Sequence, residues 1–109
     1  MSNKQLANLS RAVLDFNNIV KRLEVILEDS DDLSAKSTLN MLSDVAERSI
    51  RNVQADPKAL ASLVAKAPWG EFTWPLFFIV SDVHYAILQE KIQNLETAGR
   101  NYIRTEEGK

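Results

Sequence analysis

Residues 6–27 read LANLSRAVLDFNNIVKRLEVIL, and this stretch decides the fold class. Its apolar residues recur at alternating spacings of three and four, which places them on one face of an α-helix as a heptad seam. The seam consists of Leu6, Leu9, Val13, Phe16, Val20, Leu23 and Leu27. Ala12, Ile19 and Ile26 widen this stripe, so we expect the helix, residues 3–28, to pack against more than one neighbour.

An acidic segment, residues 28–32, interrupts this periodicity and predicts a turn followed by the cap of a second helix. Small polar side chains accept hydrogen bonds from the free N–H groups at a helix start, and negative charge is favourable there. The second helix is predicted over residues 33–55. Its expected buried stripe is Ala35, Leu39, Leu42, Ala46, Ile50 and Val53.

Two other helix starts carry cap signals. Ser2 and Gln5 have the spacing of a capping box at the start of the first helix. Asp56 precedes Pro57, and a proline at the first helical position loses no hydrogen bond that the helix needs. A short third helix is therefore predicted over residues 57–66. Its expected apolar side consists of Leu60, Leu63 and Val64.

The segment between the two remaining prolines, residues 68–75, is expected to be a compact loop. The residue before a proline disfavours helix, and Gly70 is free to adopt a left-handed conformation. No further breaker occurs before Gly99, so a long fourth helix is predicted over residues 75–102. Its start, residues 76–80, is apolar on every side and is expected to be surrounded by protein. Its later stripe consists of Leu88, Ile92, Leu95 and Tyr102.

Length and composition predict one all-α bundle domain over residues 1–109. A chain of this size buries roughly two-thirds of its unfolded surface, which is enough for a single core. Apolar residues make up 45% of the chain and charged residues 26%, which is ordinary for a folded domain and unlike disorder. We expect the three long helices to pack near-antiparallel, with the short helix and the aromatic loop closing one end. The tail from about residue 105 is expected to fray.

The side chains that most enzyme chemistry requires are scarce. The chain has no cysteine, and His84 is its single histidine, which excludes thiol chemistry and multi-histidine metal sites. Ser81 lies three residues before His84, but a catalytic pair would need a third group and an oxyanion hole. Isolated glycines exclude a phosphate loop, and residues 29–40 lack the glycine and glutamate of a calcium loop. The sequence predicts a protein that is not an enzyme and binds neither metal nor cofactor.

Charge and hydropathy argue against membranes and nucleic acids as partners. The longest apolar run, residues 74–80, is far shorter than the roughly 20 residues of a membrane-spanning helix. The net charge is −2 and the two signs are interspersed, so no basic field attracts phosphate backbones. The lack of cysteine and of an apolar leader at the start favours a cytoplasmic location.

Aromatic residues gather in one segment, which makes it the candidate site. Five of the eight Phe, Trp and Tyr residues fall within residues 69–78. Large rings that enter from a loop commonly plug the end of a bundle, whereas one or two rings left exposed would anchor a partner. Trp69, Phe72 and Trp74 are the candidate partner-binding residues.

The sequence therefore favours a small, non-catalytic protein–protein interaction module that acts as an adaptor, regulator or inhibitor on another protein. Its size and character are those of small phage or mobile-element inhibitors and immunity proteins, an analogy of type alone. The broad apolar faces also allow a homodimer. One alternative is a dimeric nucleic-acid-binding regulator with a positive strip of Arg48, Arg51, Lys58 and Lys66. Another is a small-ligand or enzymatic pocket near His84.

Overall fold

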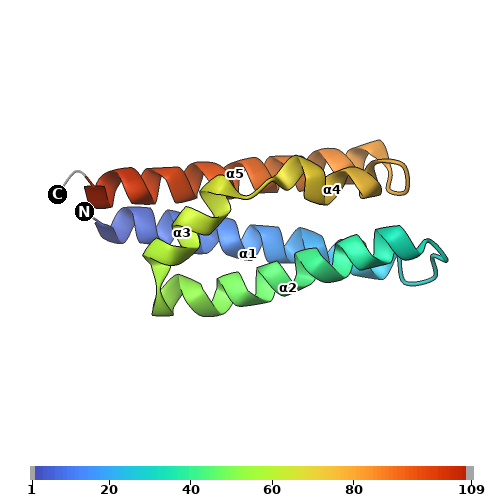
Figure 1. Ribbon diagram of the computed structural model, residues 1–109, viewed down its shortest axis with the longest axis horizontal. Helices are drawn as coiled ribbons and strands as arrows, with labels where there is room; N and C mark the ends of the chain where they lie inside the picture. Colours follow the sequence, from blue (N-terminus) through green and yellow to red (C-terminus); the bar gives the residue numbers. More distant parts are fainter. Residues whose placement is uncertain (1, 108–109) are drawn as a thin grey trace.

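A computed structural model describes residues 2–107, with the side chains of residues 4–105, and this part of the chain is almost wholly helical (Figure 1). Its five α-helices are α1 (Ser2–Ile26), α2 (Leu33–Ala55), α3 (Pro57–Lys66), α4 (Trp69–Phe77) and α5 (Asp82–Glu107). No strand occurs among the described residues. The predicted all-α class is therefore confirmed.

The helices form a bundle of four rods, the third of which is broken in two. α1 and α2 run antiparallel, α3 and α4 return in the direction of α1, and α5 runs back to the end where the chain starts (Figure 1). α1 packs against α2 and α5, while α3 and α4 each pack against α2 and α5. Every rod thus has two neighbours, and the core follows the long axis of a molecule that measures 49 × 22 × 18 Å.

The predicted bounds of α2 and α3 are confirmed, and α1 ends at Ile26 instead of residue 28. Local hydrogen bonds explain why the starts of α2 and α3 could be predicted from the sequence. Asp32 accepts a 2.8 Å hydrogen bond from the Ala35 N–H, and Asp56 accepts one of 3.2 Å from the Ala59 N–H. Both carboxylates satisfy N–H groups that a helix start leaves free. The predicted capping box at Ser2 involves a side chain outside the described residues.

The seam of α1 is the centre of the core. The buried residues of this helix, on the seam and beside it, are Leu9, Ala12, Val13, Phe16, Ile19, Val20 and Leu23, and the seam residue Leu27 is buried just after the helix ends. Leu6 is partly buried, and Ile26 at the end of the helix is exposed. The predicted late stripe of the last helix is also buried, with Leu88, Ile92, Leu95 and Tyr102.

In α2 and α3 the buried stripes differ from the predicted ones by one residue each. Ser49 is buried and the neighbouring Ile50 is exposed, while Ala61 is buried and Leu63 is exposed. Small side chains at these positions let neighbouring helices approach closely, so shape complementarity outweighs hydrophobicity there. The Ser49 hydroxyl donates a 2.7 Å hydrogen bond to a carbonyl of its own helix, which permits its burial.

The predictions of a loop over residues 68–75 and of one helix over residues 75–102 are wrong. Residues 69–77 form α4, in which Gly70 is helical, and a turn of residues 78–81 separates α4 from α5. Pro75 lies inside α4, where it has no N–H to donate, and the helix ends two residues later. α4 lies along α2 and α5, so most of the aromatic segment runs along the bundle, and only its last residues reach the end away from the termini.

Gly99 is not a helix breaker but a packing residue within α5. A Cβ atom at this position would lie 2.7 Å from Val64 Cγ2 and 2.8 Å from the Ala61 carbonyl oxygen. The backbones of α3 and α5 therefore approach each other at this glycine. α5 continues to Glu107, so residues 105–107, predicted to belong to a frayed tail, are helical, and residues 108–109 lie outside the described part.

Candidate functional site

The aromatic side chains around α4 form two separate clusters. The inner aromatic cluster consists of Phe16, Trp69 and Phe72, whose rings meet edge to face with centroids 5.4 Å (Phe16 to Trp69) and 6.0 Å (Trp69 to Phe72) apart. Trp69 is only 4% exposed, and its indole N–H donates a 2.9 Å hydrogen bond to the Val64 carbonyl. This cluster belongs to the core, where it joins α4 to α1.

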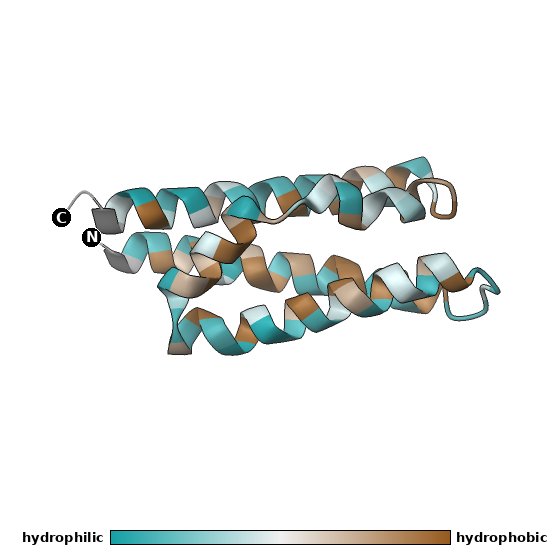
Figure 2. Cartoon of the chain, viewed as in Figure 1, coloured by the Kyte–Doolittle hydropathy of each residue, from teal (hydrophilic) through white to brown (hydrophobic). Residues whose placement is uncertain are grey.

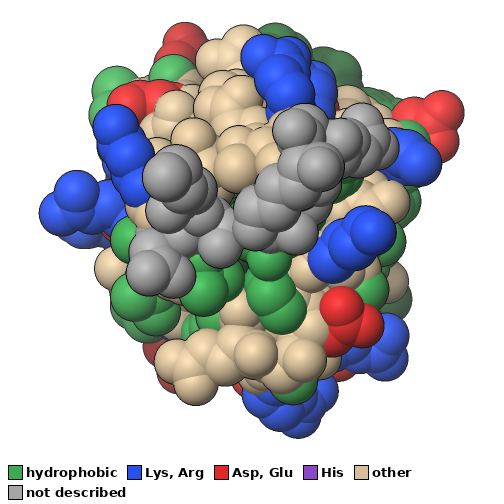
Figure 3. All heavy atoms as spheres, turned by 90° about the vertical axis from the view of Figure 1, so that its left-hand side faces the viewer, with side chains coloured by type: hydrophobic (Ala, Val, Ile, Leu, Met, Phe, Trp, Pro, Cys, Tyr) green, Lys and Arg blue, Asp and Glu red, His purple; other side chains and the backbone are tan. Residues whose placement is uncertain are grey.

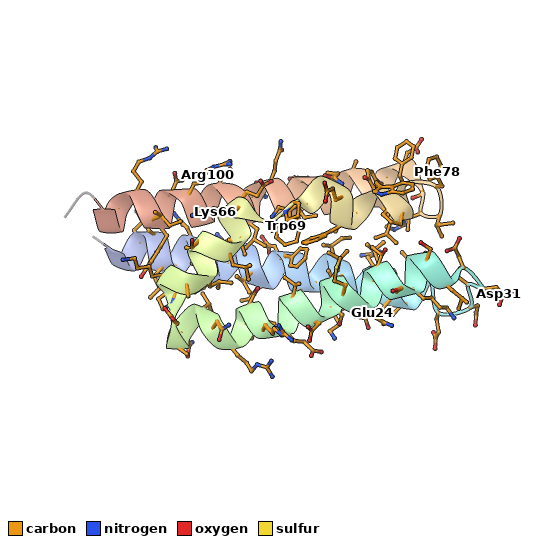
Figure 4. All side chains as sticks on the ribbon, viewed as in Figure 1. Glu24, Asp31, Lys66, Trp69, Phe78 and Arg100 are labelled. Carbon is orange, nitrogen blue, oxygen red and sulfur yellow. The ribbon has the colours of Figure 1, made fainter. Side chains whose placement is uncertain are left out.

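The outer aromatic cluster consists of Trp74, Phe77, Phe78 and Tyr85. Its rings follow one another edge to face, with centroids 6.1 Å apart for Trp74 and Phe78, 5.1 Å for Phe78 and Phe77, and 5.2 Å for Phe77 and Tyr85. Trp74 is 58% exposed, Phe77 52% and Phe78 73%. Figure 4 labels Phe78 at the end of the bundle away from the termini. The outer aromatic cluster is therefore a surface feature.

The end of α4 and the turn after it, which carry Phe77 and Phe78, are anchored on both sides. Leu76 and Val80 are buried, and the N–H groups of Ile79 and Val80 donate hydrogen bonds of 3.1 and 3.0 Å to the Leu76 carbonyl. Ser81 caps α5, since its hydroxyl oxygen accepts a 3.2 Å hydrogen bond from the His84 N–H. The residues between the two anchors are exposed, and Figure 2 shows this turn in the brown of apolar residues, at the same end of the bundle as the teal turn between α1 and α2.

A buried threonine fixes α4 against α5. The hydroxyl of Thr73, which has no exposed surface, donates a 2.9 Å hydrogen bond to the Trp69 carbonyl. The same oxygen accepts a 3.0 Å hydrogen bond from the side-chain amide of Gln89 in α5. This pair holds α4 in the position from which the outer aromatic cluster is presented.

Acidic residues surround this end of the bundle. From residue 67 to residue 90 the charged side chains are Glu71, Asp82 and Glu90, all acidic and exposed. The turn between α1 and α2 lies at the same end, as the labels of Asp31 and Phe78 in Figure 4 show. Its charged residues are also exclusively acidic: Glu28, Asp29, Asp31 and Asp32. Among the described side chains, none of these seven acids forms an ion pair.

The structure separates the three predicted partner-binding residues. Trp69 is a core residue, Phe72 is half-buried beside it, and Trp74 lies exposed in the outer aromatic cluster. Sequence reasoning missed the exposure of Phe77 and Phe78 because it placed them inside one continuous helix. Ser81 followed by an aspartate was the available signal, since both favour a new helix start.

His84 is half-buried at the start of α5. Its Nδ1 lies 2.7 Å from the Ser81 Oγ, a contact that the spacing in the sequence had indicated. Among the described residues no group of three or more His, Cys, Asp or Glu side chains is placed to hold a metal ion. Shallow grooves between α1 and α2, α1 and α5, and α3 and α5 are lined by residues other than His84.

The four cations of the predicted positive strip are all exposed, Arg48 and Arg51 on α2 and Lys58 and Lys66 on α3. Arg48 forms an ion pair with Asp44 at 3.2 Å. Lys66 instead lines a groove between α3 and α5 together with Arg100 and Arg104 (Figure 4). The structure thus brings together a set of cations that the sequence did not indicate.

Comparison of the chain with protein-family models, curated proteins and solved structures gives no significant match. Within residues 2–107, no helix combines the length and the apolar character needed to cross a membrane. The function is therefore argued from the geometry of the surface.

Proposed function

We propose that this chain is a non-catalytic protein–protein interaction module that docks through the outer aromatic cluster. The observation that carries the proposal is the row of three exposed rings, Trp74 and Phe77 at the end of α4 and Phe78 in the anchored turn that follows. With roughly 200 Å² for each aromatic side chain, their exposed fractions leave on the order of 350 Å² of aromatic surface in contact with water. Contiguous apolar patches of this size on a single chain commonly mark interaction sites.

The energetics favour these rings as anchors. Removing about 350 Å² of apolar surface from water is worth on the order of 9 kcal/mol before the costs of association. Because Leu76 and Val80 fix the turn, little conformational entropy remains to be lost when a partner covers it. Tryptophan is also among the residues that most often dominate binding energy at interfaces.

Affinity capture with matched variants tests the proposal. The wild type is compared with Trp74→Ala/Phe78→Ala and with Leu33→Ala/Leu63→Ala, which removes two exposed leucines outside the cluster. We expect one protein to be recovered by the wild type and by the leucine variant, and to be lost with the aromatic variant. Urea unfolding of all three proteins establishes that each remains folded. Equal recovery with all three would refute docking at this surface.

A nucleic-acid-binding regulator is a second candidate, which we propose on the separate observation that Lys66, Arg100 and Arg104 line one groove. Phosphate backbones are held by such cations, and the affinity falls steeply as salt rises. Titration of labelled duplex DNA and single-stranded RNA at two salt concentrations tests this candidate. Binding that weakens in Lys66→Ala/Arg100→Ala but not in Trp74→Ala/Phe78→Ala supports it, and the absence of binding at low salt excludes it.

A further inference from the structure

We infer that the partner of the outer aromatic cluster is a basic protein segment, with apolar side chains that cover the rings and Lys or Arg residues around them. This inference rests on the proposed docking function and adds the chemistry of the partner. It is carried by the combination of the exposed rings with acidic charge: the charged side chains of residues 67–90, and of the turn between α1 and α2 at the same end, are all acidic.

The rings alone are too small for a complete interface. A specific protein–protein interface covers about 800 Å² on each partner, roughly twice the exposed aromatic area. The partner must therefore also contact the border of the cluster. Glu71 lies three residues before Trp74, so both occupy one face of α4, and Asp82 begins α5 directly beside the exposed Val83.

The cations at this end lie along other surfaces. Lys36 lines the groove between α1 and α2 together with Glu24 and Glu28. Arg22 and Lys91 line the groove between α1 and α5. Neither groove contains a residue of the outer aromatic cluster, and the chain segment that carries the cluster, residues 67–90, has only acidic charged side chains.

The charged residues at the aromatic end are of one sign. The turn between α1 and α2 carries four acids and no cation, and residues 67–90 carry three acids and no Lys or Arg, whereas the end where the termini lie shows Lys and Arg together with Asp and Glu (Figure 3). Such an asymmetric field attracts a basic partner to the aromatic end and raises its association rate. A symmetric pairing of two aromatic ends would instead oppose acid to acid, and an anionic membrane would be repelled.

Two synthetic peptides of about 14 residues, four turns of helix, provide the test. Both present the same leucine face, and the remaining positions are lysine in one and glutamate in the other. Isothermal titration calorimetry measures their affinity for the full chain and for three variants. Trp74→Ala/Phe78→Ala removes two of the exposed rings. Glu71→Lys/Asp31→Lys reverses two acidic charges at the aromatic end. Asp44→Lys/Glu47→Lys makes the same change of charge at another place, in the middle of α2.

We expect the lysine peptide to bind the wild type at least about tenfold more tightly than the glutamate peptide, a preference that weakens as salt rises. Glu71→Lys/Asp31→Lys should abolish or reverse this preference, and Asp44→Lys/Glu47→Lys should retain it. The aromatic variant should weaken binding of the lysine peptide by about tenfold or more.

The remaining outcomes separate the inference from the function on which it rests. If both peptides bind equally and the aromatic variant weakens their binding, the inference of a basic partner is overturned, while docking through the outer aromatic cluster is supported. Binding that the aromatic variant does not weaken, or no binding at about 1 mM peptide, counts against both. Trp74-dependent binding to vesicles containing phosphatidylglycerol, or Phe78-dependent self-association in sedimentation velocity, overturns the inference in favour of a membrane or a second copy.

Discussion

The side-chain amide of Gln89 donates a 3.0 Å hydrogen bond to the hydroxyl oxygen of Thr73, a residue with no exposed surface. The two residues lie 16 positions apart and connect α4, which ends at Phe77, with α5 on the other side of the turn that carries Phe78. The Thr73 hydroxyl donates its own hydrogen bond to the Trp69 carbonyl. The same buried oxygen therefore takes part in two hydrogen bonds, one as donor and one as acceptor. These hydrogen bonds fix α4 against α5 at the residue that directly precedes the exposed Trp74.

Thr73→Val should lower the free energy of unfolding by about 1–3 kcal/mol, because it keeps the shape but leaves the Gln89 amide without its acceptor. Gln89→Leu removes the other partner. The double variant Thr73→Val/Gln89→Leu should cost clearly less than the two single losses added together. Urea unfolding measures all three proteins, and strictly additive losses would show that the two side chains are not coupled.

Gly99→Ala should destabilise the fold despite the better helix propensity of alanine. The new Cβ would meet the Ala61 carbonyl oxygen at 2.8 Å, and a backbone atom cannot move aside as a side chain can. Overpacking of this kind costs about 1–3 kcal/mol, against a gain of about 1 kcal/mol in propensity. Gly70→Ala is the matched control, since a Cβ at Gly70 would meet nothing within 4 Å. It should stabilise α4, and a stabilised Gly99→Ala protein would disprove the close approach of α3 and α5.

The two tryptophans should differ in fluorescence. In Trp74→Phe the remaining Trp69 should emit at short wavelength and resist acrylamide quenching, because its ring is buried against Phe16. In Trp69→Phe the remaining Trp74 should emit at long wavelength and be quenched readily. Trp69→Phe should also cost about 1–3 kcal/mol of stability through the lost indole hydrogen bond, and Trp74→Phe less than about 0.5 kcal/mol. Similar quenching of the two proteins would contradict the separation into inner and outer clusters.

Removal of the aspartate caps should have graded effects. Asp32→Ala should cost about 1 kcal/mol, because its carboxylate accepts a 2.8 Å hydrogen bond at the start of α2. Asp56→Ala should cost less, since its hydrogen bond is 3.2 Å long and exposed. Asp31→Ala serves as the control, because this exposed neighbour caps no helix. Thermal unfolding would contradict the assignment if Asp31→Ala proved as costly as Asp32→Ala.

The hardest part of the fold to predict was the region between α3 and α5. Pro68 and Pro75 suggested a loop, yet Trp69 packs on Phe16 and bonds the Val64 carbonyl, and these contacts stabilise a helix through Pro75. The continuous apolar run over residues 76–80 suggested burial. Only Leu76 and Val80 are buried, because the turn between them directs the intervening side chains outward.

The sequence indicated the aromatic segment but not which of its rings are exposed. A cluster of aromatic residues in a chain of this composition drew attention to residues 69–78, and Trp74 is exposed there. Trp69, which was predicted to bind a partner, lies in the core, whereas Phe78, which was not, is exposed to water. Spacing along the chain does not reveal which environment each ring meets.

The sequence by itself determined the helical class, the bounds of α2 and α3 and their aspartate caps. These features depend on periodicity and on hydrogen bonds between residues only three or four positions apart. The tertiary structure alone decided that α4 is separate from α5 and that the backbones of α3 and α5 approach each other at Gly99. It also decided that Phe77 and Phe78 are exposed to water, at the end of the bundle where the acidic turn between α1 and α2 lies. Those outcomes depend on contacts between segments distant in the sequence, where the free energy of packing exceeds local conformational preference.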